Sequence, residues 1–198
     1  MKKFFALALL LLTGITTFAQ VDSVDVEIRD GFRDCSYLSL RYIGTKEGTN
    51  GMYMVRVLVD KKSVINLYQD QVMSFRKTFD ELCKKTSEWE NKFDEYVKYN
   101  DIDSLYKQMS ISFGKLNVVG ENGREYEIEP EVYFKAEKNT FNGNTFSVIF
   151  IFKQGSRVVR TMKIDNNDKI YQIYKKLEGF HINQALKKKL ATIDEIFN

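Results

Sequence analysis

Histidine, tryptophan and proline are almost absent from this chain of 198 residues, which contains one of each. The single histidine, His181, leaves too few ligands for a zinc site, which needs several histidines and cysteines. It also argues against a Ser-His-Asp triad, and no Gly-x-Ser-x-Gly turn is present to hold a serine nucleophile. His181 lies between two predicted C-terminal helices, where a cation can interact with a helix end. We therefore expect a structural role for His181 and name no catalytic residue.

The glycine-rich phosphate-binding sequences, Gly-x-x-x-x-Gly-Lys-Ser/Thr and Gly-x-Gly-x-x-Gly, are also missing. A nucleotide cofactor is therefore not expected. Two segments rich in Asp and Asn, 100–104 and 165–168, do not have the residue spacing of a calcium-binding loop. Both lie where helices are predicted to begin, and Asp and Asn commonly cap helices there. The sequence predicts neither a metal site nor a cofactor.

Charge of one sign is not in excess, since 30 basic and 27 acidic residues give a formal net charge of +3. Two of the basic residues, Lys2 and Lys3, lie in a predicted leader, so the remaining chain is closer still to neutral. Such a protein has no long-range field to attract nucleic acid or anionic membranes. The densest basic run, 187–189, is expected to be a solvated helix face. A nucleic-acid partner is not expected.

Residues 1–19 read as a cleavable export signal. Two lysines precede the apolar run 4–12, which is too short for a membrane span of about 20 residues. Thr17 and Ala19 are small residues at the two positions that signal peptidase reads, so cleavage is predicted between Ala19 and Gln20. No cysteine adjoins this cut, which disfavours a lipoprotein. We expect a soluble periplasmic or secreted protein.

The remaining residues, 20–198, contain no further apolar run of membrane length and no repeat or low-complexity tract, so they are predicted to form one domain. Two cysteines remain, Cys35 and Cys83. In an oxidising compartment such a pair favours a disulfide, which would close a long loop and stabilise the fold by about 4 kcal/mol. Two buried thiols are the alternative, and the sequence leaves both open.

Seven segments have the residue alternation, or the apolar runs, of β-strands. They are 24–28, 35–43, 52–60, 124–128, 131–137, 145–153 and 157–164. Short polar turns join many of them, and a parallel crossover would need a dozen or more residues, so the pairing is predicted to be antiparallel. Because 145–153 is apolar on both faces, this strand is predicted to lie in mid-sheet, covered on both sides.

The strongest periodic signal is a helix whose apolar residues recur at alternating spacings of three and four. They are Val72, Phe75, Phe79, Leu82, Thr86, Trp89, Phe93 and Tyr96, with Thr86 the single polar member. We predict that Asn66 caps this helix with Gln69 completing a capping box, and that it extends to about Lys98. Thr86 and Ser87 mark a candidate bend. Trp89 is expected in the core because it shares the apolar face.

After this helix, Asp103 or Ser104 is predicted to cap a short turn through Tyr106. Near the C-terminus, Asp165 or Asn167 is expected to cap one helix that ends at Gly179, and another follows to the end of the chain. These elements predict an α+β fold with a mainly antiparallel sheet of hairpin-connected strands, one long central helix and a C-terminal helical segment packed on one sheet face.

No motif identifies the function. The leading hypothesis is a non-catalytic binding protein of the cell envelope that holds a partner protein or a ligand. An envelope hydrolase using carboxylates and tyrosines, or a structural accessory of an envelope complex, is the alternative.

Glu127, Glu129 and Glu131 alternate around Pro130, which is expected to break their strand at a sheet edge. Tyrosines that could form a contact surface are Tyr37, Tyr42, Tyr53, Tyr68, Tyr99, Tyr106 and Tyr133.

Overall fold

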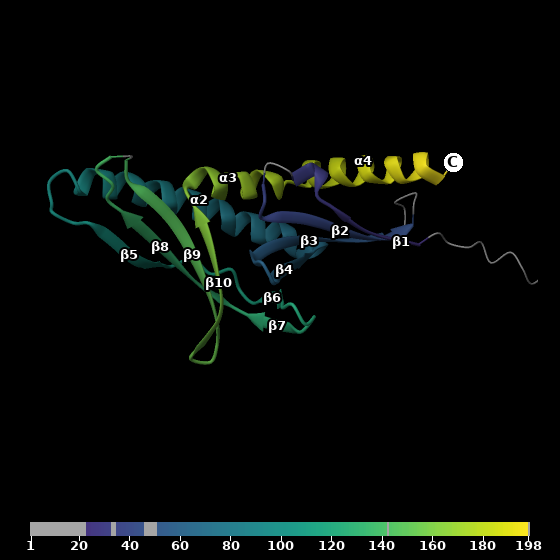
Figure 1. Cartoon of the computed structure of the whole chain (residues 1–198), viewed down its shortest axis with the longest axis horizontal. Helices are drawn as coiled ribbons and strands as arrows, with labels where there is room; N and C mark the ends of the chain where they lie inside the picture. The colour runs from purple at the N-terminus through teal and green to yellow at the C-terminus, as the bar shows by residue number, and fades with distance from the viewer. Residues whose placement is uncertain (1–22, 33–34, 46–50, 142, 198) are drawn as a thin grey trace, which may run out of the picture.

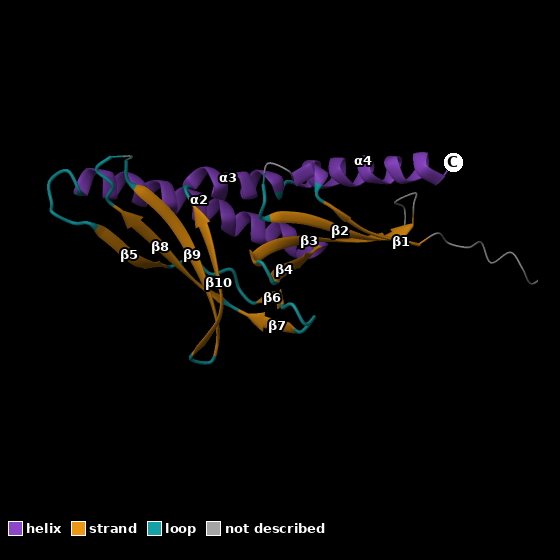
Figure 2. Ribbon diagram, in the orientation of Figure 1, coloured by secondary structure: helices purple, strands orange, loops and turns teal. Residues whose placement is uncertain are grey.

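Two antiparallel sheets lie beneath a layer of helices (Figures 1 and 2). The computed structural model describes residues 23–32, 35–45, 51–141 and 143–197. The predicted leader, with its cut between Ala19 and Gln20, lies outside these residues. The described part has ten strands, three α-helices and one short 3-10 helix. The predicted α+β class with antiparallel pairing is therefore confirmed, with two sheets.

The larger sheet has six strands in the order β1-β2-β3-β4-β6-β7. They are β1 Ser23–Ile28, β2 Leu38–Thr45, β3 Gly51–Asp60, β4 Ser63–Tyr68, β6 Leu116–Val119 and β7 Glu125–Ile128. The predicted hairpin of β2 and β3 is present, with Tyr42 opposite Tyr53. Alternate residues of these strands, such as Leu40, Val55 and Ile65, are fully buried beneath the helices. The other face of the sheet carries the polar half of the alternation.

The smaller sheet has four strands in the order β10-β9-β8-β5. They are β5 Ser104–Met109, β8 Pro130–Glu137, β9 Thr145–Gln154 and β10 Arg157–Asp165. The central position predicted for β9 is confirmed. Its residues Phe150 and Phe152 are fully buried, whereas Ile149 and Ile151 on the other face are half-buried. That second face is therefore covered less than predicted.

The helices lie on one side of both sheets (Figure 2). They are α2 Gln69–Tyr96, α3 Asn167–Lys176 and α4 Gly179–Phe197, with the 3-10 helix η1 Asp30–Phe32 beneath α4. Helix α2 contacts β3 and β4 of the larger sheet and β8 of the smaller sheet, so it crosses both. Helix α3 packs on α2 and β10, and α4 packs on η1 and β1. No helix in the described ranges is long and apolar enough to span a membrane.

Aromatic rings fill the space between α2 and the smaller sheet. Phe79 on α2 stacks with Phe150 of β9 at a centroid distance of 6.2 Å, and Phe113 packs edge-on against both rings at 5.4 and 5.2 Å. Trp89 meets Phe134 of β8 edge-on at 5.5 Å. Trp89 therefore packs against the core, but it is half-buried and not enclosed as predicted. Burial of these rings is the main source of stability for the long helix, because propensity alone stabilises helices weakly.

The start of the long helix differs from the prediction. Asn66 lies inside β4, opposite Arg56 of β3, and the helix begins at Gln69. The backbone N–H of Tyr68 donates to the side-chain oxygen of Gln71 at 3.1 Å, so the capping box forms two residues later than predicted. Pairing of β4 with strands on both sides overrides the local capping preference of Asn66.

The helix is also continuous through Thr86 and Ser87, where a bend was a candidate. The Thr86 hydroxyl donates to the carbonyl oxygen of Leu82 at 2.7 Å, so this buried polar group is satisfied inside the helix. A hydroxyl that bonds back four residues can sit in a buried helix face without breaking it.

Three other local predictions were wrong. Residues 104–109 form strand β5, which pairs with β8, and not a short helical turn. Asn166, not Asp165 or Asn167, caps α3, since its side chain accepts from the Lys169 N–H at 3.1 Å. Gly179 is the first residue of α4, not a helix end.

Pro130 marks one of the three places where the chain changes sheets. Strand β7 of the larger sheet ends at Ile128, and Pro130 is the first residue of β8 in the smaller sheet. A proline at a strand start removes no ladder hydrogen bond that the strand needs. The predicted break is therefore present, although β8 is an inner strand and not an edge.

Candidate ligand-binding groove

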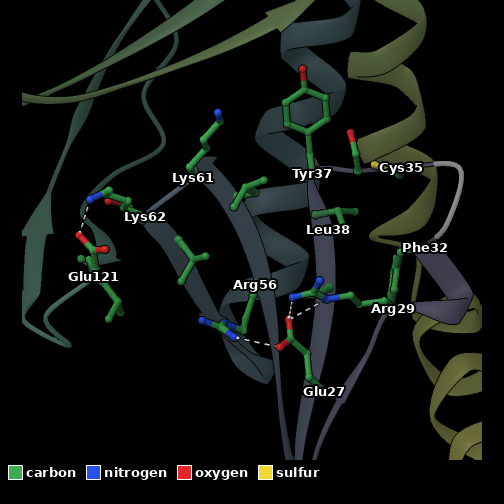
Figure 3. A pocket seen from close by; sticks show the side chains of 17 residues that line it. Glu27, Arg29, Phe32, Cys35, Tyr37, Leu38, Arg56, Lys61, Lys62 and Glu121 are labelled. Atoms are coloured by element: carbon green, nitrogen blue, oxygen red, sulfur yellow. Dashed lines mark hydrogen bonds and ion pairs between the residues drawn. The ribbon is translucent and has the colours of Figure 1, made fainter.

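A cavity of about 750 Å³ opens on the face of the larger sheet that the helices leave uncovered (Figure 3). Its floor consists of side chains that alternate along the strands with the buried ones. They are Ser39 of β2, Leu58 of β3, Val64 of β4 and Val119 of β6. The cavity is within the size range of small-molecule sites, about 300–1,000 Å³. We call it the sheet groove.

Four cations line the sheet groove. Arg29 follows β1, Arg56 lies on β3, and Lys61 and Lys62 form the two-residue turn between β3 and β4 (Figure 3). The lining contains two carboxylates, Glu27 and Glu121. Cations therefore outnumber anions among the described lining residues, so the potential in the groove favours a negative group.

The two carboxylates are already paired. Glu27 lies 3.2 Å from Arg29 and 3.6 Å from Arg56, and Glu121 lies 2.8 Å from Lys62. Lys61 is exposed and has no ion-pair partner within the part of the chain that the structure describes. Because one carboxylate, Glu27, contacts both Arg29 and Arg56, some N–H donors of these two guanidinium groups remain available to an anion.

The Lys61–Lys62 turn is fixed by polar contacts below it. Asp60 accepts the Lys62 backbone N–H at 2.7 Å, and its other carboxylate oxygen lies 3.4 Å from Arg160 of β10. Arg160 also donates to the hydroxyl of Ser63 at 2.6 Å. Arg160 therefore neutralises Asp60 from the smaller sheet, which leaves the Lys61 side chain to act in the groove.

Glu27 is not suited to act as an acid. Partial burial works to raise its pKa, but hydrogen bonds from Ser39 and Arg29 and the charges of Arg29 and Arg56 outweigh it, so the pKa is lowered. A general acid near neutral pH needs a raised pKa. None of the described lining residues is a histidine. The groove chemistry therefore favours binding of an anion over proton transfer to a substrate.

The predicted tyrosine surface is not one surface. Tyr37 lines the sheet groove and donates to the carbonyl oxygen of Lys163 at 3.3 Å, and burial is the first cause that raises its pKa. Tyr42 is buried, and Tyr99 is 86% exposed beyond the end of α2. The other four tyrosines lie in two different places. Tyr53 and Tyr68 are half-buried in the larger sheet, and Tyr106 and Tyr133 stack on each other on the smaller sheet.

No disulfide joins Cys35 and Cys83, both of which are described residues. Cys35 is buried at the wall of the sheet groove, whereas Cys83 lies half-buried on α2. Burial, and then the charge of Asp80, raises the pKa of the Cys83 thiol to about 11. A thiol with so high a pKa is a poor nucleophile at neutral pH. His181 lies on α4, where its ring contacts Phe180.

Of the remaining acidic candidates, Glu129 and Glu131 line one cavity of about 430 Å³, whereas Glu127 does not line it. Glu127 pairs with Lys115 on the larger sheet, Glu129 accepts from Ser112, and Glu131 pairs with a lysine of β9. In the described residues no group of three or more His, Cys, Asp or Glu could hold a metal ion. Each of these three carboxylates therefore has a local partner.

The four groove cations were missed from the sequence. Arg29, Arg56, Lys61 and Lys62 are dispersed over 34 residues of an evenly charged chain, and only sheet pairing brings them together. The alternation of β3 predicts that Arg56 lies on the polar face of the sheet. It does not predict which residues of other strands lie next to Arg56 on that face.

Comparison of the chain with models of protein families, with curated proteins and with solved structures gave no match.

Proposed function

We propose that this protein is an exported, non-catalytic binding protein that holds an amphipathic anion in the sheet groove. The observation that carries the proposal is a cavity of about 750 Å³ with cations at its rim and aliphatic side chains in its floor. Arg29, Arg56 and Lys61 would receive a carboxylate or phosphate group. Leu58, Val64 and Val119 would contact an apolar body.

Export is supported by the leader-like residues 1–19, and N-terminal sequencing of protein from its native cells should then begin at Gln20. A binding role without catalysis is supported by the state of the groove carboxylates. Glu27 is held between two arginines and Glu121 is paired with Lys62. A hydrolase using two acids would need one of them protonated and both aimed at a substrate.

The test uses anilinonaphthalene sulfonate, a fluorescent amphipathic anion, with the mature protein. We expect saturable binding that weakens with salt, because the groove cations attract the sulfonate electrostatically. Decanoate and decyl phosphate should displace the probe, and the stronger of the two identifies the preferred head group. Both competitors should be recovered intact, since the proposal includes no bond cleavage.

Lys61→Gln and Arg56→Gln should each weaken binding roughly tenfold, because each removes one charge-assisted contact. Arg41→Gln is the matched control, since Arg41 lies on the same sheet face, is paired with Asp25 at 2.8 Å and does not line the groove. Unchanged binding by both groove variants, equal weakening by Arg41→Gln, or hydrolysis of decyl phosphate would contradict the proposal.

A further inference from the structure

The two sheets have four edge strands, and three of them are protected against pairing with another chain. β7 has four residues and carries Glu125 and Glu127. β1 carries Asp25 and Glu27. On β10 a register shift interrupts the strand, and the carbonyl oxygen of Lys163 already accepts a hydrogen bond from the Tyr37 hydroxyl. Charges, short length and irregularity are the usual means by which proteins block sheet edges.

β5 is the fourth edge. It has six residues, no register shift against β8 and a single charged residue, Lys107. Its only pairing partner among the described strands is β8. Ser104, Tyr106 and Gln108 are exposed and share the sheet face away from the helices, where they carry no charge. Lys107 points to the helix side, where its ammonium lies 5.1 Å from the Trp89 ring. Lys107 is itself exposed, but it lies on the sheet face opposite to Tyr106.

The backbone of β5 shows which groups remain open. The carbonyl oxygen of Asp103 accepts from the Lys138 N–H of the neighbouring chain segment at 2.8 Å. In an antiparallel pair the hydrogen-bonding direction alternates from residue to residue, so Leu105 and Lys107 also face β8. The N–H and C=O groups of Ser104, Tyr106 and Gln108 therefore face outward from the sheet edge.

We propose that two copies of this chain pair through β5, antiparallel, about a two-fold axis at Tyr106. This register places Tyr106 opposite its counterpart and Ser104 opposite Gln108, so all three outward residues of each copy are used. About six backbone hydrogen bonds form, and the facing side chains are uncharged. On the helix side, Leu105 lies opposite Lys107.

Charge and aromatic contacts both favour this axis. An axis at Lys107 would place two ammonium groups directly opposite each other, which destabilises a strand pair. Tyr106 is 53% exposed and already stacks on Tyr133, with ring centroids 4.9 Å apart. Pairing at Tyr106 brings two such stacks side by side on one face and joins two four-stranded sheets.

This proposal is independent of the proposed function, because the sheet groove lies on the larger sheet and no residue of β5 lines it. Sedimentation equilibrium of the mature protein should show a mass that rises with concentration to twice that of one chain. Tyr106→Pro should raise the dissociation constant roughly a hundredfold, because it removes an outward N–H without touching the β8 ladder. Tyr106→Thr is the matched control, which keeps this N–H and should still associate.

Amide hydrogen exchange of the unaltered protein gives a test that needs no variant. Protection at Ser104, Tyr106 and Gln108 should increase with protein concentration, whereas protection at Leu105 and Lys107 should not change. A single-chain mass at every concentration, a Tyr106→Pro variant that associates like the unaltered protein, or concentration-independent exchange at these three amides would overturn the proposal.

Discussion

Glu90 is a half-buried acid on α2 whose pKa is raised to about 7. Burial is the first cause, followed by the negative charges of Asp94 and Asp168. Asp94 accepts a hydrogen bond from Asn144 at 2.6 Å, which holds its carboxylate in place. No cavity described above includes Glu90, so we interpret its raised pKa as a stability effect and not as a sign of catalysis.

The raised pKa of Glu90 predicts that stability falls as pH rises. Between its ordinary pKa of 4.5 and its folded value of about 7, the folded state binds a proton that the unfolded chain has lost. This contribution is complete below the lower value and is lost above the upper one. Glu90→Gln should therefore stabilise the protein by about 1–2 kcal/mol at about pH 8 and have little effect near pH 4, allowing for partial solvent screening.

Urea unfolding at the two pH values measures this difference. Glu81→Gln serves as the control, because Glu81 is an exposed acid on the same helix. If both variants change the unfolding free energy equally, or if Glu90→Gln has the same effect at both pH values, burial of Glu90 does not control the pH dependence.

At the scale of single residues, the sequence predicted burial better than it predicted contacts. Val55, Phe79 and Phe150 are buried as expected, because alternation and helical spacing specify which side chains turn inward. The groove cations could not be predicted, because Arg56 and Lys61 meet Arg29 only through the pairing of β1, β2 and β3.

At the scale of elements, α2 is the part that the sequence specified most fully. Its apolar residues predict one helix of about 45 Å, and the structure has a continuous helix of 28 residues. The predicted start of this helix was wrong because the buried residues Ile65 and Leu67 belong to strand β4, whose partner strands lie elsewhere in the chain. Strand β5 was missed for a similar reason, since its exposed residues show little apolar alternation.

Phe79 tests how strongly the smaller sheet holds α2. Its ring is fully buried and contacts Phe75, Phe113 and Phe150. Phe79→Ala should lower the free energy of unfolding by about 3–5 kcal/mol, because it removes a ring and leaves a cavity among the others. Met73→Ala on the same helix should change it by less than about 0.5 kcal/mol, since Met73 is 68% exposed. Chemical unfolding of both variants measures these changes. Equal losses of unfolding free energy would mean that the aromatic cluster does not anchor the helix.

At the scale of the whole molecule, hairpins predicted from the sequence fix which strands are neighbours but not how many sheets they form. The chain crosses between the sheets through α2, between β5 and β6, and at Pro130. The sequence shows a break in the strand pattern at Pro130, but not that the next strand joins another sheet. Sheet edges likewise become visible only in the assembled topology, which is why the exposed side of β5 could not be recognised beforehand.

The junction of the two sheets depends on Arg160 of β10, which reaches Ser63 and Asp60 of the larger sheet. Ser63 is 2% exposed, so its hydroxyl needs this donor. Arg160→Met should cost about 1–3 kcal/mol of unfolding free energy and weaken probe binding in the sheet groove, because the Lys61–Lys62 turn loses its support.

A double-mutant cycle with Ser63→Ala isolates the contact between the sheets. We expect a coupling energy of about 0.5–3 kcal/mol for Arg160 and Ser63, which are hydrogen-bonded neighbours. The exposed pair of Lys62 and Glu121 provides the comparison and should couple by no more than about 1 kcal/mol. Additive effects of Arg160→Met and Ser63→Ala would show that this hydrogen bond does not hold the two sheets together and that the β3–β4 hairpin itself positions the groove turn.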